Sequence, residues 1–219
     1  MKNYTDITIL MDRSGSMASI KDAMESGLQE FVQQHQKNPS TRLTFVQFDD
    51  QDNQDVQFTA RPITEVEKIT LTPRGWTPLL DSLCKTIDNT GNRLRGMSST
   101  DRPKLVLFLI VTDGAENYSK QYKREDVKRR IETQQKDYNW QFVYLGANQD
   151  AFAEAASFGI AKGHTLNYAG DGVHAYAAMQ LLARSTSPMF AGEDACFTGF
   201  TAEDQKVATG TGTTPTAKP

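Results

Sequence analysis

Two nearly continuous apolar runs limit most strongly what this chain can fold into. They are residues 7–11 (ITILM) and residues 105–111 (LVLFLIV), and residues 142–145 (FVYL) form a shorter run of the same kind. Strands that are buried on both faces read as continuous rather than alternating apolar runs, and they occur in parallel sheets that helices cover. The sequence therefore predicts a mostly parallel sheet with helices on both of its faces.

A fourth and a fifth segment predict an antiparallel edge to this sheet. Residues 41–48 (TRLTFVQF) alternate more clearly between apolar and polar, and residues 56–60 can pair with them in a hairpin. The connecting stretch is rich in aspartate, but it lacks the glycine and glutamate that a calcium-binding EF-hand loop needs at its sixth and twelfth positions. We interpret it as a solvated hairpin loop.

Segments with helical spacing lie between the expected strands. Apolar side chains follow a helical stripe over residues 20–32, and a second stripe over residues 79–94 begins after Pro78. Further helices are expected over residues 123–136, 149–157 and 172–183, the last with Asp171 as its N-cap. This alternation predicts an α/β fold with a doubly wound, mostly parallel central sheet and one antiparallel edge strand.

The chain has 219 residues, which suits one domain and a tail. We expect the domain to span residues 1–184 and a polar, acidic tail to span residues 185–219. Thr201 matches a helix-capping pattern, so one short helix is expected after Phe200. The stretch after Val207 has no large apolar side chain, and we expect it to be disordered.

Composition excludes several classes of partner and location. The formal net charge is −3, whereas a nucleic-acid-binding domain is typically strongly basic. The longest apolar run has seven residues, far fewer than the roughly 20 of a membrane-spanning helix. Asp6 and Asp12 flank the first apolar run, and no signal-peptide cleavage pattern follows it. The chain has only two cysteines, too few for a disulfide scaffold, so we expect a cytoplasmic protein. From the charge and the short apolar runs, we expect no nucleic-acid or membrane partner.

Polar residues stand where the buried strands end. The first run is followed by Asp12-Arg13-Ser14-Gly15-Ser16 and the long run by Thr112-Asp113-Gly114, and Thr77 lies just before a helix. Ligands of open α/β sheets bind at the carboxyl ends of the strands, so these side chains are expected at one edge. The candidate metal-site residues are Asp12, Ser14, Ser16, Thr77 and Asp113.

A hard divalent cation explains this combination of two carboxylates and three hydroxyls. Without one, the two negative charges repel each other and raise one pKa. Mg²⁺ takes oxygen ligands in octahedral geometry and uses only one or two carboxylates, and Mn²⁺ suits the same donors. If the aspartates act through bridging waters or hydroxyls, the metal stays electrophilic and accepts an oxygen from a partner's Asp or Glu.

These residues are where the sequence resembles the von Willebrand factor A (VWA) family. Asp12-Arg13-Ser14-Gly15-Ser16 matches the family's Asp-x-Ser-x-Ser motif, while Thr77 and Asp113 match its threonine and second aspartate in the expected order. The resemblance covers roughly residues 4 to 185. It implies a Rossmann-like fold and a metal-ion-dependent adhesion site (MIDAS) that binds Mg²⁺ or Mn²⁺. It also implies protein binding rather than catalysis.

The same resemblance indicates which residues surround the metal. Trp76 stands where many relatives carry a second glycine, and it adds a bulky aromatic side chain to the rim. We expect Trp76, Arg13 and Gly114 to form the partner-binding rim, with packing against the next helix as the alternative for Trp76. Residues 120–130 hold six basic and two acidic side chains, which we interpret as a solvated helix face. A small stand-alone chain of this type resembles bacterial or phage members.

Three other interpretations of the same residues stay open at this point. Asp12, Ser14 and Ser16 are also typical capping residues for the helix that begins near Ile20, and Thr77 before Pro78 is a typical N-cap. Aspartates at strand ends with a metal also suit a Mg²⁺-dependent phosphohydrolase or phosphotransferase, although Ser14 stands where such an enzyme usually has a second carboxylate. The third alternative is a metal-free structural or assembly protein, for example in a phage virion, because fold alone does not fix function.

Overall fold

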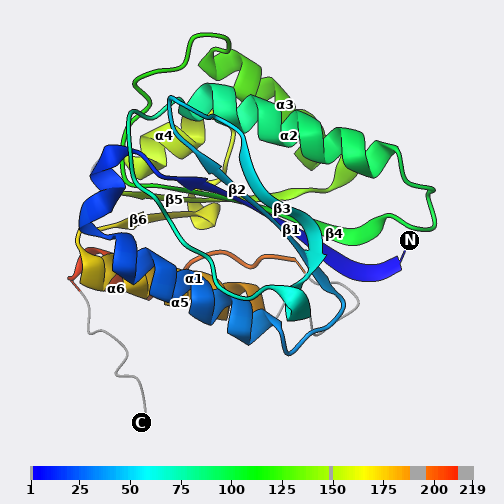
Figure 1. Ribbon diagram of the computed structural model, residues 1–219, viewed down its shortest axis with the longest axis horizontal. Coiled ribbons are helices and arrows are strands. Elements are labelled where there is room, and N and C mark those ends of the chain that lie inside the picture. The colour runs from blue at the N-terminus through cyan, green and yellow to red at the C-terminus, as the bar shows by residue number, and fades with distance from the viewer. Residues whose placement is uncertain (1, 148–149, 188–195, 212–219) are drawn as a thin grey trace.

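The computed structural model describes residues 2–147, 150–187 and 196–211, and it contains a six-stranded sheet between two layers of helices (Figure 1). The strand order is β3-β2-β1-β4-β5-β6. The strands are β1 (Lys2–Asp12), β2 (Thr41–Phe48), β3 (Asp55–Pro62), β4 (Pro103–Thr112), β5 (Gln141–Ala147) and β6 (Thr165–Tyr168). All neighbouring strands are parallel except β2 and β3, so the predicted fold class and its antiparallel edge strand are confirmed.

The central strands are apolar on both faces because each face has its own core. Ile9 of β1 pairs with Leu109 of β4, and both side chains point into one core. The next pair, Leu10 and Ile110, points into the other core. Successive side chains of a strand point to opposite faces, so two covered faces require the continuous apolar runs seen in the sequence.

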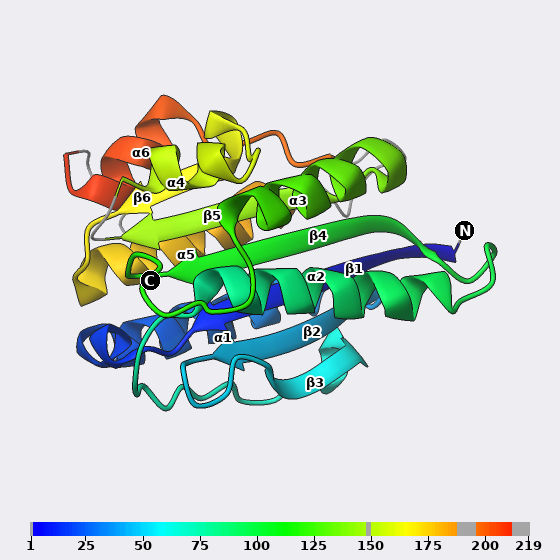
Figure 2. The ribbon, with the colours of Figure 1, turned by 90° about the horizontal axis from the view of Figure 1, so that it is seen from above.

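Helices cover the two faces in separate groups, as Figures 1 and 2 show. On one face lie α2 (Leu79–Arg95), α3 (Arg124–Tyr138) and α4 (Ala151–Ser157), and on the other lie α1 (Lys21–His35), α5 (Gly172–Thr186) and α6 (Ala202–Thr209). Three short 3-10 turns are η1 (Gly15–Ser19), η2 (Ile63–Glu65) and η3 (Lys162–His164). The expected helices are all present, although Gln149 lies outside the described residues.

Close packing of α1 on α5 depends on one glycine. A Cβ atom on Gly27 would lie 2.5 Å from the Cβ atom of Met179, which is closer than such atoms approach in proteins. A larger residue at position 27 would therefore push the two helices apart.

Among the strands of the described residues, β6 is the one that the sequence did not reveal. It has only four residues, TLNY, whose polar and apolar side chains alternate over too short a stretch to indicate a strand. It pairs with β5 at the edge of the sheet, where residue Leu166 lies beside Leu145. Its strand conformation follows from this pairing rather than from a local signal.

The segment beyond residue 184 contributes side chains to the core. Phe197, Phe200 and Val207 are buried against the α1–α5 face. Thr201 caps α6 as expected, with its hydroxyl accepting a hydrogen bond from the Asp204 amide. The helix runs to Thr209, two residues into the stretch expected to be disordered, and residues 212–219 lie outside the described range. The domain boundary at residue 184 stays a prediction.

Within the described ranges, no helix is both long enough and apolar enough to cross a bilayer.

Candidate metal centre

Three loops meet at the carboxyl edge of the sheet, at the left-hand end of Figures 1 and 2. They follow β1, precede α2 and follow β4. The amide of Gly15 donates to the carbonyl of Gly75 over 3.1 Å, which joins the first loop to the second. The Thr77 amide donates to Asn117 Oδ1 (2.9 Å) and the Asn117 amide donates to the Thr77 carbonyl (3.2 Å), which joins the second to the third.

Asp12 is completely buried at the end of β1. Its Oδ1 accepts a hydrogen bond from the Ser14 amide (2.7 Å), and its Oδ2 accepts one from the Thr112 hydroxyl (2.6 Å). Burial, which removes the hydration of the charged form, raises the pKa of Asp12 most, and with the smaller effect of nearby Asp113 the pKa reaches about 7 despite the hydrogen bonds from Thr112 and Ser14, which lower it. Across the described residues, no Lys, Arg or His side chain forms an ion pair with Asp12.

Asp113 connects to the first loop through hydroxyl groups. The Ser16 hydroxyl donates to Asp113 Oδ1 over 2.7 Å, and Ser14 Oγ lies 3.1 Å from Ser16 Oγ. Asp113 is 2% exposed, and burial raises its pKa as well. The predicted residues of the first and third loops therefore form one connected cluster.

Thr77 joins this cluster from the second loop. A Cβ atom built on Gly114 would lie 3.7 Å from both Ser16 Oγ and Thr77 Oγ1, so the two hydroxyls lie on the same side of that glycine. The capping interpretation gains no support, because Ser14 makes no side-chain capping bond to η1 and the N-cap of α2 is Pro78. Five residues from three segments that are distant in the sequence thus lie close together: Asp12, Ser14, Ser16, Thr77 and Asp113.

The donor atoms of this cluster suit a hard divalent cation. They are two carboxylates and three hydroxyls, without nitrogen or sulfur, which is the donor chemistry of Mg²⁺ and Mn²⁺. The described part of the chain contains no group of three or more His, Cys, Asp or Glu side chains placed to hold a metal. A transition-metal site rich in imidazole or thiolate is therefore not formed by these residues.

Comparison with known proteins agrees with this geometry. The family model described as von Willebrand factor type A domain matches residues 6–173, which is most of the chain. The chain belongs to the von Willebrand factor type A domain family. No curated protein sequence matches this VWA domain.

Several solved structures share the fold of this VWA domain at low sequence identity. Proximal thread matrix protein 1 (PTMP1) from the mussel byssus, with a zinc-occupied MIDAS motif, is 15% identical over 84% of this chain and 46% of that chain, with a TM-score of 0.57. The PilB minor pilin from Streptococcus sanguinis is 11% identical over 85% of this chain and 62% of that chain (TM-score 0.58). This chain thus spans less than two thirds of either protein.

A third similar structure is nearly the same size. The vWF domain of the type V pili tip protein Mfa5 from Porphyromonas gingivalis is 11% identical over 84% of this chain and 95% of that chain, with a TM-score of 0.53. At these identities the similarity shows the fold alone. The evidence for the candidate metal site comes from the residues of this VWA domain itself.

Arg13 lies differently from the exposed rim position that we expected. It is 6% exposed, and its Nε donates to Asp49 Oδ2 over 2.6 Å while its Nη1 pairs with Asp55. Arg74 Nε donates to the same Asp49 oxygen over 2.7 Å. Burial alone would raise the pKa of Asp49, but the hydrogen bonds from the two arginines and from the loop amides leave it below its usual value. Arg13 therefore holds the β1 loop to the β2–β3 loop.

This network also changes the interpretation of the aspartate-rich loop after β2. Asp49 is 0% exposed rather than solvated, and its Oδ1 accepts hydrogen bonds from the amides of Gln51 and Asp52. The sequence revealed the charges of this loop but not their partners. Those partners come from two other loops of the domain.

Several residues that shape the candidate site were not among the site residues predicted from the sequence. Thr112 and Asn117 contact Asp12 and Thr77 directly. Glu116 accepts hydrogen bonds from the Leu80 amide at the start of α2 and from two amides of its own loop. Asp81 accepts from the amides of residues 120, 121 and 122. These two carboxylates fix the long β4–α3 loop, and only the fold brings them to it.

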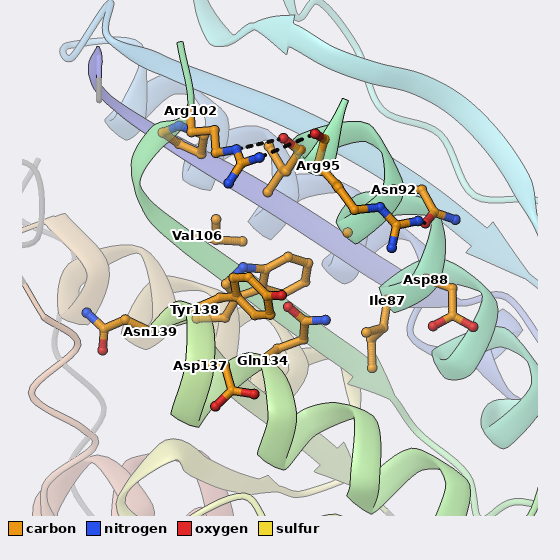
Figure 3. Close-up of a pocket in the computed structure, with 14 residues that line it drawn as sticks. Ile87, Asp88, Asn92, Arg95, Arg102, Val106, Gln134, Asp137, Tyr138 and Asn139 are labelled. Atoms are coloured by element: carbon orange, nitrogen blue, oxygen red, sulfur yellow. Dashed lines mark hydrogen bonds between the residues drawn. The ribbon is translucent and has the colours of Figure 1, made fainter. Parts of the chain in front are cut away.

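A separate hollow of about 840 Å³ lies between the C-terminal halves of α2 and α3 (Figure 3). Val106 and Trp140 give it apolar walls. Arg102 also lines it, and its guanidinium donates hydrogen bonds to the carbonyls of Leu94 and Arg95. It lies near the amino end of β4, the end of that strand opposite the candidate metal centre.

Proposed function

We propose that this VWA domain binds proteins through a divalent cation at the carboxyl edge of its sheet. The supporting observation is that three loops bring together oxygen donors alone, including a fully buried carboxylate that lacks a cationic partner among the described residues. A buried charge is stable only when another charge or several hydrogen bonds compensate it. A bound cation provides that compensation.

The cation is expected to be Mg²⁺ or Mn²⁺, held by the hydroxyls of Ser14, Ser16 and Thr77. The hydrogen bond from Ser16 Oγ to Asp113 Oδ1 supports a role in which this carboxylate acts on the cation through the hydroxyl rather than as a direct ligand. Asp12 is completely buried, and its carboxylate orients the Ser14 amide and the Thr112 hydroxyl by accepting a hydrogen bond from each. A cation with few direct carboxylate ligands keeps enough positive charge to take an Asp or Glu oxygen from a partner protein.

This arrangement favours binding over catalysis. Ser14, rather than a second carboxylate, follows Asp12 by two residues, and its hydroxyl lies against Ser16. The zinc-occupied MIDAS motif of PTMP1 supports a divalent cation at such a site. The absence of nucleic-acid and membrane partners, the cytoplasmic location and the bacterial or phage origin remain predictions.

The test is the melting temperature of the full chain with EDTA, with excess Mg²⁺ and with excess Mn²⁺. A ligand present at 100 times its dissociation constant stabilises the folded state by about 2.7 kcal/mol. We expect a metal-dependent rise in melting temperature that Thr77→Val and Ser16→Ala remove.

Thr90→Val is the matched control, because Thr90 is as buried as Thr77 but lies in α2 against Thr8. This variant should keep the full metal-dependent rise. The proposal fails if neither cation raises the melting temperature of the parent, or if Thr77→Val responds to metal as strongly as Thr90→Val.

A further inference from the structure

Two large aromatic side chains stand exposed beside the candidate metal centre. Trp76 is 58% exposed and Tyr118 is 36% exposed. Trp76 directly precedes Thr77, and Tyr118 directly follows Asn117, the residue whose side chain and backbone bind Thr77. Their rings are nearly parallel, at 8°, with centroids 6.4 Å apart. We call Trp76 and Tyr118 the aromatic pair.

The backbone around the aromatic pair is held by hydrogen bonds to two half-buried carboxylates. The Trp76 amide donates to Asp50 Oδ1 over 2.9 Å, and the Tyr118 amide donates to Glu116 Oε1 over 2.8 Å. The two loops are then joined by the paired hydrogen bonds between Thr77 and Asn117. Binding to a surface already held in place loses less conformational entropy than binding to a mobile one.

Gly75 sets the backbone conformation immediately before Trp76. Its φ angle is +67°, a conformation that favours glycine, and a Cβ atom there would lie 1.8 Å from Asp50 Oδ1. The same Asp50 oxygen holds the Trp76 amide. A side chain at position 75 would therefore strain this turn and displace the Asp50 carboxylate from the Trp76 amide.

A positive charge completes this surface. Lys120 Nζ lies 4.3 Å from the centroid of the Tyr118 ring, on its face. Because Asp12 and Asp113 are neutralised when a divalent cation is bound, the cation site and Lys120 together favour an acidic ligand. The aromatic pair beside Lys120 favours an aromatic ring, since aromatic side chains that pack together gain energy beyond the burial of their area.

We propose that the partner of this site is an acidic polypeptide segment in which an aromatic residue is adjacent to the metal-binding Asp or Glu. The carboxylate goes to the cation, and the neighbouring Phe, Tyr or Trp side chain packs on Trp76 and Tyr118. This inference rests on the proposed function, because the cation positions the carboxylate. It assigns the specificity to the aromatic pair.

The experiment uses immobilised peptides of the form Gly-Ser-Gly-Asp-Z-Gly-Ser and Gly-Ser-Gly-Z-Asp-Gly-Ser, where Z is each of the natural amino acids, and matched peptides with Asn in place of Asp. The full-length chain is bound to them with excess Mg²⁺ or with EDTA. The parent should bind the Asp peptides only with Mg²⁺, and aromatic Z should improve binding by about threefold to tenfold.

Trp76→Ala and Tyr118→Ala should lose the preference for aromatic Z while they keep the preference for Asp over Asn and the metal-dependent melting shift. Tyr138→Ala is the control, because Tyr138 is 61% exposed but lies beside the hollow between α2 and α3 in Figure 3. It should keep both preferences.

The two proposals fail in different ways. If the parent prefers Asp over Asn with Mg²⁺ but shows no preference for aromatic Z, the inference is overturned and the proposed function stands. The inference is also overturned if Trp76→Ala leaves the aromatic preference unchanged or if Tyr138→Ala reduces it equally. If no Asp peptide binds better with Mg²⁺ than with EDTA, both proposals are contradicted.

Discussion

Replacement of Asp12 by Asn should stabilise the metal-free protein while it removes the response to metal. In the folded chain, burial raises the pKa of Asp12 from 3.8 to about 7. Each pKa unit corresponds to about 1.36 kcal/mol, so the ionised carboxylate costs roughly 4 kcal/mol of folding free energy above pH 7. This cost arises mainly because the charged Asp12 carboxylate is buried, and we expect a bound cation to offset part of it.

The sign of the pH dependence follows from the raised pKa. The folded chain holds the Asp12 proton more tightly than the unfolded chain, so the contribution of this group is most favourable below about pH 4 and is lost as the pH rises to about 7. An Asn side chain does not titrate. It keeps an acceptor for the Ser14 amide but weakens the bonds that the carboxylate makes, so we expect a net gain of about 2 kcal/mol at pH 8.

The assay is urea unfolding of parent and Asp12→Asn in EDTA at pH 5 and pH 8, repeated with Mg²⁺. The variant should be more stable than the parent at pH 8, similar to it at pH 5, and insensitive to Mg²⁺. Asp81→Asn is the control, because Asp81 is 5% exposed but accepts three backbone hydrogen bonds, and its replacement should destabilise the chain by about 2 kcal/mol. A less stable Asp12→Asn at pH 8 in EDTA would refute the electrostatic reasoning.

Three further predictions concern the packing of the helices and the site. Burial lowers the pKa of His35 from 6.5 to about 4, so the folded chain disfavours the protonated imidazole. The free energy of unfolding should therefore fall by roughly 3 kcal/mol as the pH drops from 6.5 to 4, and His35→Gln should remove this dependence in acid unfolding curves. Gly27→Ala should destabilise the chain by about 1–3 kcal/mol in urea, because the new methyl group overlaps Met179, whereas Ala23→Gly on the same helix should show only the smaller cost of its helix propensity. Gly114→Val should reduce the Mg²⁺-dependent melting shift, because the new valine side chain would lie beside the Ser16 and Thr77 hydroxyls. The metal-free melting temperature should fall by no more than a few degrees, and an unchanged Mg²⁺-dependent shift would contradict this placement.

Much of the fold was predictable because its signals are local. Residues 7–11 and 105–111 are apolar without interruption, and this pattern is enough to indicate strands covered on both faces. Helical spacing and capping residues located α2 and α6 in the same way. Strand β6 escaped prediction because four residues carry too little periodicity, and its conformation depends on β5.

The gathering of the candidate metal-site residues at one edge of the sheet was predictable for a different reason. Asp12 and Asp113 each follow an apolar run, and in a parallel sheet the ends of such runs meet at one edge. Their environment was not predictable. Thr112 hydrogen-bonds Asp12 across 100 residues of sequence, and Asn117 binds Thr77 across 40. Neither contact leaves a local pattern.

The sequence by itself determined the parallel sheet, the position of its loops and the oxygen donors at its carboxyl edge, because these follow from periodicity and strand order. Only the tertiary structure decided how the loops face one another. It buried Arg13 in an ion pair with Asp49 instead of exposing it, and it stacked Trp76 on Tyr118 at the surface. These outcomes depend on which backbone segments pack together, and that is a property of the whole chain rather than of any short stretch.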